Sequence, residues 1–582
     1  MAAAAAAVPA GERLAVVDAR FVGHRHSLRL ALTDPRYPLA AVPGAVAARP
    51  DARAVLTRAL ARQAAERPTV PAAPGAPGEQ PAAPTDSLPD RLAARLEAEQ
   101  RPVHRPELGV LVATVPREPA EREAAQRAVA EVDEERVRLR SAVKSRDGFF
   151  TTFCISPYSR YLARWCARRG LTPNQVTCAS LVTALVAAGC AATGTRVGFV
   201  AAGVLLLGSF VLDCTDGQLA RYSLQYSTLG AWLDATFDRA KEYAYYAGLA
   251  LGAARGGDDV WALALAAMVL QTSRHVVDFA FAEASQDAEG RASPPASALS
   301  ARLDRVGWTV WVRRMIVLPI GERWALLAVF TAATTPRLTF LVLLVGCALA
   351  ACYTTAGRVL RSLRHRRRRS ERAVRALADL ADTGPLGEAV AAAARRLGWA
   401  SPSVLAPALA LLGGALLVGT AALAPVGSGW PVAAAVAYVV LSGLATCRPP
   451  RHALDWLVPA FFRAAEYTLV LTLAARSGAN GALPAAFGLV AAVAYHHYDT
   501  VYRIRGGSGA PPRLLTRAVG GQEGRALLVA VAATLWSAGG SGLTAALTAL
   551  AVALALTVLA ESVRFWVSAQ APAVHDETGE PA

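Results

Sequence analysis

Hydrophobic residues in this chain are gathered into long blocks, and the first block begins only after residue 170. Most blocks are about 17–25 residues long, the length that a helix needs to cross the hydrocarbon core of a bilayer. These blocks predict an all-α polytopic membrane protein. The predicted spans lie near residues 176–194, 197–213, 229–252, 259–281, 322–335, 337–357, 402–424, 430–446, 454–474, 482–499, 523–537 and 541–562.

The residues before the first span have a different pattern. Residues 1–66 contain a strand-like run from Leu14 to Ala19 and an Ala/Arg-rich helical stretch, which predict a small cytoplasmic region that is either mixed in structure or partly disordered. Residues 67–115 are interpreted as a Pro/Ala-rich linker, because Pro, Ala and Gly gather at its start. Residues 116–170 carry Glu and Arg at helical spacing and predict cytoplasmic and interfacial helices.

Basic residues gather at the ends of the predicted spans and give the chain a net charge of +16. The densest group, Arg358, Arg361, Arg364 and Arg366 to Arg369, directly follows an apolar block. A nucleic-acid patch is the alternative interpretation, but Lys and Arg at span ends are retained on the cytoplasmic side of a membrane. We therefore expect no nucleic-acid partner, contacts with anionic membrane lipids, and a multi-pass inner (plasma) membrane protein whose termini are both cytoplasmic.

Four aspartates follow the second span and open the third. Asp213 and Asp216 are three residues apart, so they share one face of a helix, and Asp234 and Asp238 share a face of the next helix. Four carboxylates at a membrane face are costly unless cations neutralise them. Oxygen ligands with this charge suit Mg²⁺ or Mn²⁺, and two ions would bring the site near neutrality. The alternative is a set of helix-end acids that face solvent.

Small and basic residues are interleaved with these carboxylates. Gly217, Ala220 and Gly230 lack bulk, which lets a ligand or a facing backbone approach closely. Arg221 presents a planar fork that can bind phosphate oxygens.

The complete spacing, Asp213-x2-Asp216-Gly217-x2-Ala220-Arg221-x8-Gly230-x3-Asp234-x3-Asp238, resembles the signature of the CDP-alcohol phosphotransferase family at every position. The resemblance covers about residues 144–360 and implies a six-span bundle. It implies transfer of a phosphoalcohol group, such as the phosphatidyl group of CDP-diacylglycerol, to an acceptor hydroxyl in phospholipid synthesis, with release of CMP. The active site would face the cytoplasm.

The resemblance also assigns roles to residues. It implies that Asp213, Asp216 and Asp234 are metal ligands and that Asp238 is both the last ligand and the general base. It implies that CDP is contacted by Gly217, Ala220, Arg221 and Gly230, with Pro173 and Asn174 added from the turn before the first span, where Pro at a helix start is the alternative interpretation.

The acceptor is suggested by the segment before the first span. Residues 144–164 look like the interfacial helix of family members that handle inositol phosphate, some of which are fused to a nucleotidyltransferase. Residues 1–66 would then be a relic of that domain. Arg239, Lys241 and Arg274 are candidates for binding the acceptor phosphate. The alternatives are interfacial anchoring for Arg239 and Lys241, and snorkelling or pairing with Asp278 for Arg274.

The second half of the membrane part looks like a degenerate copy of the first. A basic linker over 361–394 separates six spans over 171–360 from six over 395–565, and 566–582 predict a disordered tail. Four segments recur in order: Ala167-Arg-Arg and Ala394-Arg-Arg, Arg239-x2-Glu-Tyr243 and Arg463-x2-Glu-Tyr467, His275-x2-Asp278 and His496-x2-Asp499, and Gly321-Glu-Arg-Trp-Ala-Leu-Leu327 with Glu523-Gly-Arg-Ala-Leu-Leu528.

The copy lacks the carboxylates, since Val458 and Phe462 stand where Asp234 and Asp238 would align. We expect it to act as an inactive partner within one chain, a pseudo-dimer that can remain a monomer. A shielding or lipid-handling role for the second half is one alternative. A membrane transporter or scaffold of six-plus-six type is the alternative for the whole chain.

Overall fold

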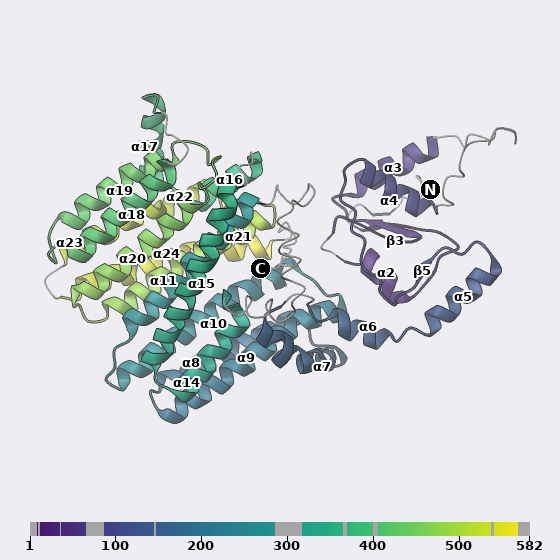
Figure 1. The fold of residues 1–582 in the computed structure, drawn as a ribbon, viewed down its shortest axis with the longest axis horizontal. Helices are drawn as coiled ribbons and strands as arrows, with labels where there is room; N and C mark the ends of the chain where they lie inside the picture. Colours follow the sequence, from purple (N-terminus) through teal and green to yellow (C-terminus); the bar gives the residue numbers. More distant parts are fainter. Residues whose placement is uncertain are drawn as a thin grey trace. The chain divides into compact units, whose positions relative to one another are not determined.

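The computed structural model describes residues 8–9, 12–34, 37–65, 87–144, 147–285, 317–364, 369–399, 405–536 and 540–568. Helices dominate this part of the chain, as predicted for an all-α polytopic membrane protein (Figure 1). The chain divides into two compact units. One comprises residues 1–145, 158–173 and 215–230, and the other comprises 146–157, 174–214 and 231–582.

The first unit contains a small antiparallel sheet in the order β1-β4-β3, formed by Leu14–Val17, Ala45–Ala48 and Leu39–Val42. The strand-like run at Leu14 is therefore a strand. Gly44, with a φ of +82°, closes the tight turn between β3 and β4. A two-residue pairing joins β2 (Val22–Gly23) to β5 (Ala113–Thr114). The helices of this part are α2 (Arg25–Leu32), α3 (Arg53–Ala65) and α4 (Leu88–Ala98).

The linker predicted over 67–115 is wrong in its second part, which contains α4 and β5. Leu92, Ala93 and Leu96 of α4 are fully buried in the core that the sheet forms with α3. Ser87 caps the helix by accepting a hydrogen bond from the backbone N–H of Asp90. The Pro/Ala-rich composition hid this short amphipathic pattern, and residues 66–86 lie outside the described residues.

Three helices lie in the segment for which cytoplasmic and interfacial helices are predicted: α5 (Pro119–Ala130), α6 (Glu134–Ser141) and α7 (Ser156–Arg168). A π-helical turn over Thr151–Ile155 leads into α7. Tyr158, Tyr161 and Trp165 are exposed along one side of α7. Exposed aromatic side chains at this spacing are typical of a helix that lies at a membrane–water interface.

Each predicted span corresponds to one helix. The first six are α8 (Pro173–Ala192), α9 (Arg196–Ser223), α10 (Thr228–Arg255), α11 (Trp261–Ser285), α14 (Ile320–Ala333) and α15 (Pro336–Arg364). The others are α18 (Leu405–Leu423), α19 (Trp430–Thr446), α20 (Leu457–Ser477), α21 (Ala482–Arg505), α23 (Gly521–Leu535) and α24 (Gly542–Val567). Short helices α16 (Glu371–Leu380), α17 (Pro385–Arg396) and α22 (Arg513–Val519) connect some of them.

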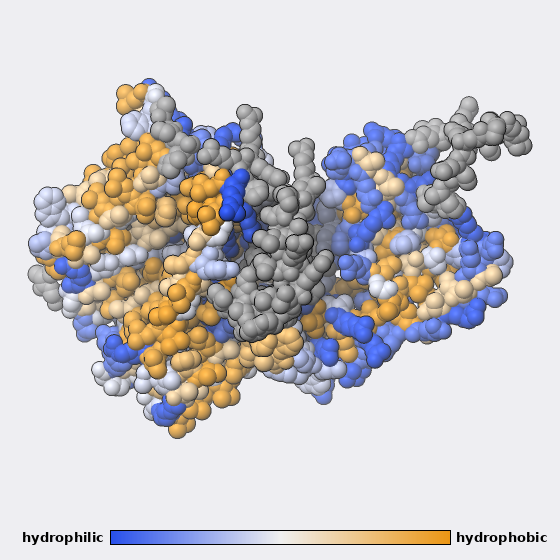
Figure 2. Space-filling view, viewed as in Figure 1, coloured by the Kyte–Doolittle hydropathy of each residue, from blue (hydrophilic) through white to orange (hydrophobic). Residues whose placement is uncertain are grey.

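Among the described residues, six helices are long and apolar enough to cross a membrane: α8, α9, α15, α18, α20 and α24. The others are shorter or carry more polar side chains, so a count of twelve spans stays a prediction. Large hydrophobic side chains such as Leu349, Leu412 and Leu556 are exposed on these helices. Figure 2 shows the hydrophobic surface that results, which suits contact with lipid chains. The 569–582 tail and Arg366 to Arg368 lie outside the described residues.

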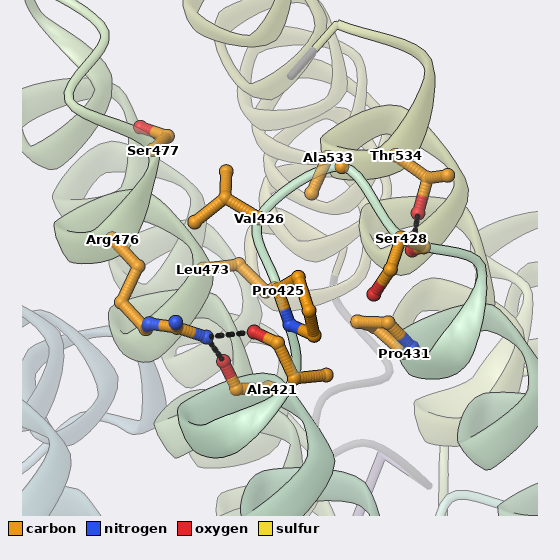
Figure 3. Close-up of a pocket in the computed structure, with 12 residues that line it drawn as sticks. Ala421, Pro425, Val426, Ser428, Pro431, Leu473, Arg476, Ser477, Ala533 and Thr534 are labelled. Atoms are coloured by element: carbon orange, nitrogen blue, oxygen red, sulfur yellow. Dashed lines mark hydrogen bonds between the residues drawn. The ribbon is translucent and has the colours of Figure 1, made fainter.

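Helix packing joins the two membrane halves. Within the halves, α11 packs on α15 and α21 packs on α24, while α11 also packs against α20 and α21 of the second half. Gly248 allows α10 to approach α8 closely, because a Cβ there would lie 2.4 Å from the carbonyl oxygen of Ala188. At the end of α20, Arg476 donates to the carbonyl oxygens of Ala421 and Ala424 and so caps α18, beside a small hollow (Figure 3).

A buried ion network holds the second half together. Arg463 donates to Glu466 at 2.9 Å and to Asp382 at 2.8 Å, and Arg525 donates to the same two carboxylates at 2.6 and 2.8 Å. Burial alone would raise the pKa of Asp382, but Arg463 and Arg525 bring it well below its ordinary value. The pairing of Asp382 therefore contributes stability at neutral pH that is lost as the pH falls below the ordinary pKa of a carboxyl group, about 4, toward the lowered pKa of Asp382.

Replacement of Arg525 by Ala should cost about 3–5 kcal/mol of unfolding free energy, because two buried carboxylates lose a partner. The matched control is Arg517→Ala, since Arg517 forms an exposed pair with Glu388 at 3.1 Å, and its loss should cost under about 1 kcal/mol. Thermal unfolding of the full chain in a mild detergent measures both variants. Equal losses would contradict a stabilising role for the network.

Candidate active site and metal centre

Helices α9 and α10 and the turn between them carry the predicted motif. The apolar run of α9 ends at Leu212, and Asp213 and Asp216 follow on one face of its last turns. Leu224 turns the chain with a φ of +54°. Ser227 then caps α10 by accepting a hydrogen bond from the backbone N–H of Gly230 at 2.9 Å. The turn reverses the direction of the chain, so that Asp234 of α10 lies near Asp213 and Asp216 of α9.

Three of the four predicted metal ligands come together. Asp213, Asp216 and Asp234 each offer a carboxylate oxygen, and the three oxygens lie within 4.8 Å of one another. Asp216 is buried, and the other two are partly buried. Clustered carboxylates without nitrogen or sulfur ligands fit a hard divalent cation such as Mg²⁺ or Mn²⁺.

Asp238 is not part of this group of three. Its Oδ1 accepts a hydrogen bond at 3.1 Å from the ammonium of Lys241, which also donates to Asp213. Lys241 is fully buried, with the ring of Trp324 5.8 Å from its Nζ. The ammonium therefore bridges carboxylates of α9 and α10, and it offsets one of four negative charges. That Lys241 contacts an acceptor phosphate stays a prediction. The roles of Asp238 as general base and as fourth metal ligand also stay predictions.

Four of the predicted nucleotide contacts lie on the same two helices, with Gly217, Ala220 and Arg221 on α9 and Gly230 on α10. Gly217 faces Arg221, since a Cβ at Gly217 would lie 3.4 Å from Nη1 of that arginine. Arg221 donates through Nε to the carbonyl oxygen of Ala142 at 2.6 Å. Pro173 is the first residue of α8 and Asn174 follows it; this position also fits the ordinary preference of Pro for helix starts.

The contacts that hold the end of α9 are not predicted by the sequence pattern. Arg138 of α6 donates to the carbonyl oxygen of Tyr222 at 3.1 Å, and its guanidinium lies 4.2 Å from the centre of the Tyr222 ring. Glu135 of the same helix accepts hydrogen bonds from Arg164 and Arg168 of α7. No spacing rule joins residues so far apart in the chain, so nothing in the pattern could have shown these contacts.

The remaining basic candidates donate hydrogen bonds to other groups of the protein. Arg239 donates to Glu242 at 3.0 Å. Arg274 donates to the carbonyl oxygen of Val317. Asp278, which is the alternative partner considered for Arg274, is ion-paired with Arg358.

The stretch of the chain that carries the carboxylate group matches a known family. Residues 170–352 match the family model described as CDP-alcohol phosphatidyltransferase, so the chain contains a membrane-embedded domain of that class, as its motif predicts. Residues 371–582 match a family of unknown function (DUF5941), which covers the second membrane half.

Individual proteins with related sequences narrow the comparison further. The chain is similar to a phosphatidylinositol phosphate synthase of Streptomyces avermitilis, with 38% identity over 111 residues, or 19% of this chain and 43% of the relative. It is 37% identical over 130 residues to a phosphatidylinositol phosphate synthase of Mycolicibacterium smegmatis, or 22% of this chain and 57% of the relative. A bifunctional IPC transferase and DIPP synthase of Thermococcus kodakarensis is 33% identical over 116 residues, or 20% and 26% of the two chains. The matches thus span about half or less of each relative.

Metal binding can be tested directly on the purified protein. Asp213→Asn and Asp234→Asn should each weaken Mn²⁺ binding by at least about tenfold, or 1.4 kcal/mol, because each removes a charged oxygen ligand. Calorimetry or the electron spin resonance signal of free Mn²⁺ reports the affinity. Asp258→Asn, which changes an exposed aspartate in the turn between α10 and α11, is the control and should bind normally. Unchanged affinity in both site variants would exclude a metal centre here.

Proposed function

We propose that this protein transfers the phosphatidyl group of CDP-diacylglycerol to a hydroxyl of inositol phosphate and releases CMP in phospholipid synthesis. The observation that carries the proposal is the group of three carboxylates, at 4.8 Å or less, inside a complete CDP-alcohol phosphotransferase motif. Two relatives named phosphatidylinositol phosphate synthase support the choice of acceptor. We further propose that the site faces the cytoplasm at the inner membrane, because basic residues follow the spans on that side.

The carboxylates of α9 and α10 would hold two Mg²⁺ or Mn²⁺ ions. When bound, these ions supply positive charge against the pyrophosphate and the departing CMP. Asp213, Asp216 and Asp234 provide oxygen ligands, and Asp238 completes the set. Lys241 keeps Asp213 and Asp238 in register across the two helices through its hydrogen bonds.

The transfer is a displacement at phosphorus. The oxygen of the acceptor hydroxyl bonds to the phosphorus of the phosphatidyl group, the bond from that phosphorus to the CMP oxygen breaks, and CMP leaves with the electron pair. Asp238 takes the proton of the acceptor hydroxyl. Arg221 binds phosphate oxygens of the nucleotide through its planar fork, and Gly217 leaves room for them.

We propose that the second membrane half is a degenerate repeat that acts as an internal partner. An Arg–Glu–Arg arrangement occurs in both halves. Glu242 is paired with Arg239 at 3.0 Å and with Arg323 at 3.1 Å, and Glu466 is paired with Arg463 and Arg525. The second arginine is Arg323 of α14 in the first half and Arg525 of α23 in the second half, and each lies on the fifth predicted span of its half. The segments that are similar in sequence therefore also make similar contacts.

Two further pairs of features support the repeat. Glu322 accepts a hydrogen bond from the backbone N–H of Phe150, and Glu523 accepts one from the backbone N–H of Gly387. Phe150 precedes the helical turn that leads into α7, and Gly387 lies in the first turn of α17, so both donors lie near the start of the helix before the first predicted span of their half. Gly170 and Gly398 follow those helices with φ angles of +72° and +69°. Among the described residues, the group of three carboxylates occurs in the first membrane half alone, which does not favour a six-plus-six transporter.

Activity is tested with purified protein, CDP-diacylglycerol, Mg²⁺ and a panel of acceptors that includes inositol phosphate, inositol and glycerol phosphate. CMP release and a new lipid should require Mg²⁺ or Mn²⁺ and stop with excess EDTA. Asp238→Asn should lower kcat by about 10²-fold or more, because the proton acceptor is lost, whereas Asp258→Asn should not. Full activity in EDTA, or transport without product, would contradict the proposal.

The oligomeric state tests the internal partner. Since α20 and α21 already cover α11, the purified chain should be a monomer in mild detergent by light scattering coupled to size exclusion. Deletion of residues 395–582 should lower stability or drive the remaining half to dimerise, because helices in lipid associate by packing and polar contacts. A full-length homodimer joined through the catalytic halves would refute the idea.

A further inference from the structure

One tyrosine of the second half reaches into the catalytic half. Tyr498 lies on α21, within the segment that matches the family of unknown function, and it is 3% exposed. Its hydroxyl is 2.5 Å from Nδ1 of His275 on α11. Its ring centre is 5.5 Å from the guanidinium carbon of Arg239 on α10. The contacts therefore cross from one matched segment to the other.

Arg239 is the residue that Tyr498 covers, and it directly follows Asp238 in the motif. Glu242 on the same helix accepts one hydrogen bond from Arg239, and Nδ1 of His275 lies 3.4 Å from the same nitrogen. Tyr246 donates to Glu242 at 2.7 Å, and Arg323 pairs with it, so this carboxylate is itself fixed. An aromatic face beside a guanidinium stabilises the charge and limits its orientation.

The corresponding arginine of the second half is held differently. Arg463 is paired with two carboxylates, Asp382 and Glu466, whereas the ion pair of Arg239 among the described residues is with Glu242. A guanidinium has five N–H donors in a fixed fork. Two carboxylates occupy much of that fork in Arg463. In the part of the chain that the structure describes, Arg239 has one carboxylate, the His275 nitrogen and the Tyr498 ring beside it, so its fork keeps N–H groups for a further anion.

The two halves also differ at the tyrosine itself. When His275-x2-Asp278 is aligned with His496-x2-Asp499, Tyr498 corresponds to Val277. The ring is therefore present only in the half that lacks the metal carboxylates, and it is directed at the half that has them. A purely structural repeat contact gives no reason for this asymmetry.

We propose that Tyr498 is a positioning residue for Arg239, and that the second half thereby fixes the guanidinium that recognises the phosphate of the acceptor. The inference rests on the proposed function. It gives the segment of unknown function a specific role, because that segment supplies the aromatic wall and the hydroxyl on His275 that hold Arg239 beside Asp238.

The test compares phosphorylated and unphosphorylated acceptors in the full-length protein. Tyr498→Ala should raise KM for inositol phosphate by about tenfold, since an aromatic–cation contact in a dry site is lost. KM for CDP-diacylglycerol should change by less than about twofold, and the preference for inositol phosphate over inositol should fall by the same tenfold factor. Tyr498→Phe keeps the ring and should show a smaller effect in the same direction.

The matched control is Tyr495→Phe, because Tyr495 lies on the same helix and its hydroxyl is 2.9 Å from Ser562 within the second half. This variant should leave the preference unchanged. Equal losses with both acceptors, or an unchanged preference in Tyr498→Ala and Tyr498→Phe, would overturn the inference. If Tyr498→Ala does not fold, Tyr498→Phe and Tyr498→Leu decide the question. A wild-type protein that releases no CMP with any acceptor would instead refute the proposed function.

Discussion

An ionised side chain inside a helical bundle in lipid needs a partner of opposite charge, because no water is present to solvate it. The two membrane halves meet this constraint in opposite ways. In the second half, two carboxylates and two guanidinium groups neutralise one another completely. In the catalytic half, the ammonium of Lys241 pairs with two of the four motif carboxylates, Asp213 and Asp238. The group of Asp213, Asp216 and Asp234 is where divalent cations would add positive charge, and this would distinguish a ligand site from a structural network.

On the proposal that the second half is a degenerate repeat, the same scaffold explains how that half can remain useful. At the positions that would align with Asp234 and Asp238 it has Val458 and Phe462, which are buried among apolar side chains and offer no ligand atom to a metal. The Arg–Glu–Arg pairing occurs in both halves, where it joins α10 to α14 and α20 to α23. A partner carried within one chain is always present at the interface, whatever the protein concentration. Such a partner can therefore take over the positioning of a residue in the active half.

The N-terminal unit adds a second support to the motif. Helix α6 binds the end of α9 through Arg138, and the carbonyl oxygen of Ala142, just beyond α6, accepts from Arg221. Glu135 of the same helix accepts a hydrogen bond from Arg164 of α7. The exposed aromatic side chains of α7 are of the kind found at a membrane–water interface. The arginine proposed to bind nucleotide phosphate is thus oriented from outside the membrane helices, while the carboxylates are oriented from within them.

The sequence by itself determined the helices, their approximate ends and the clustering of Asp213, Asp216 and Asp234, because helical periodicity and a short turn are local properties. It did not determine α4, whose short pattern was hidden by Pro and Ala around it. Only the tertiary structure decided that Lys241 binds carboxylates and that Tyr498 meets His275, 223 residues away in sequence. Periodicity shows which residues share a helix face, whereas the helix that this face meets depends on how all the spans pack together.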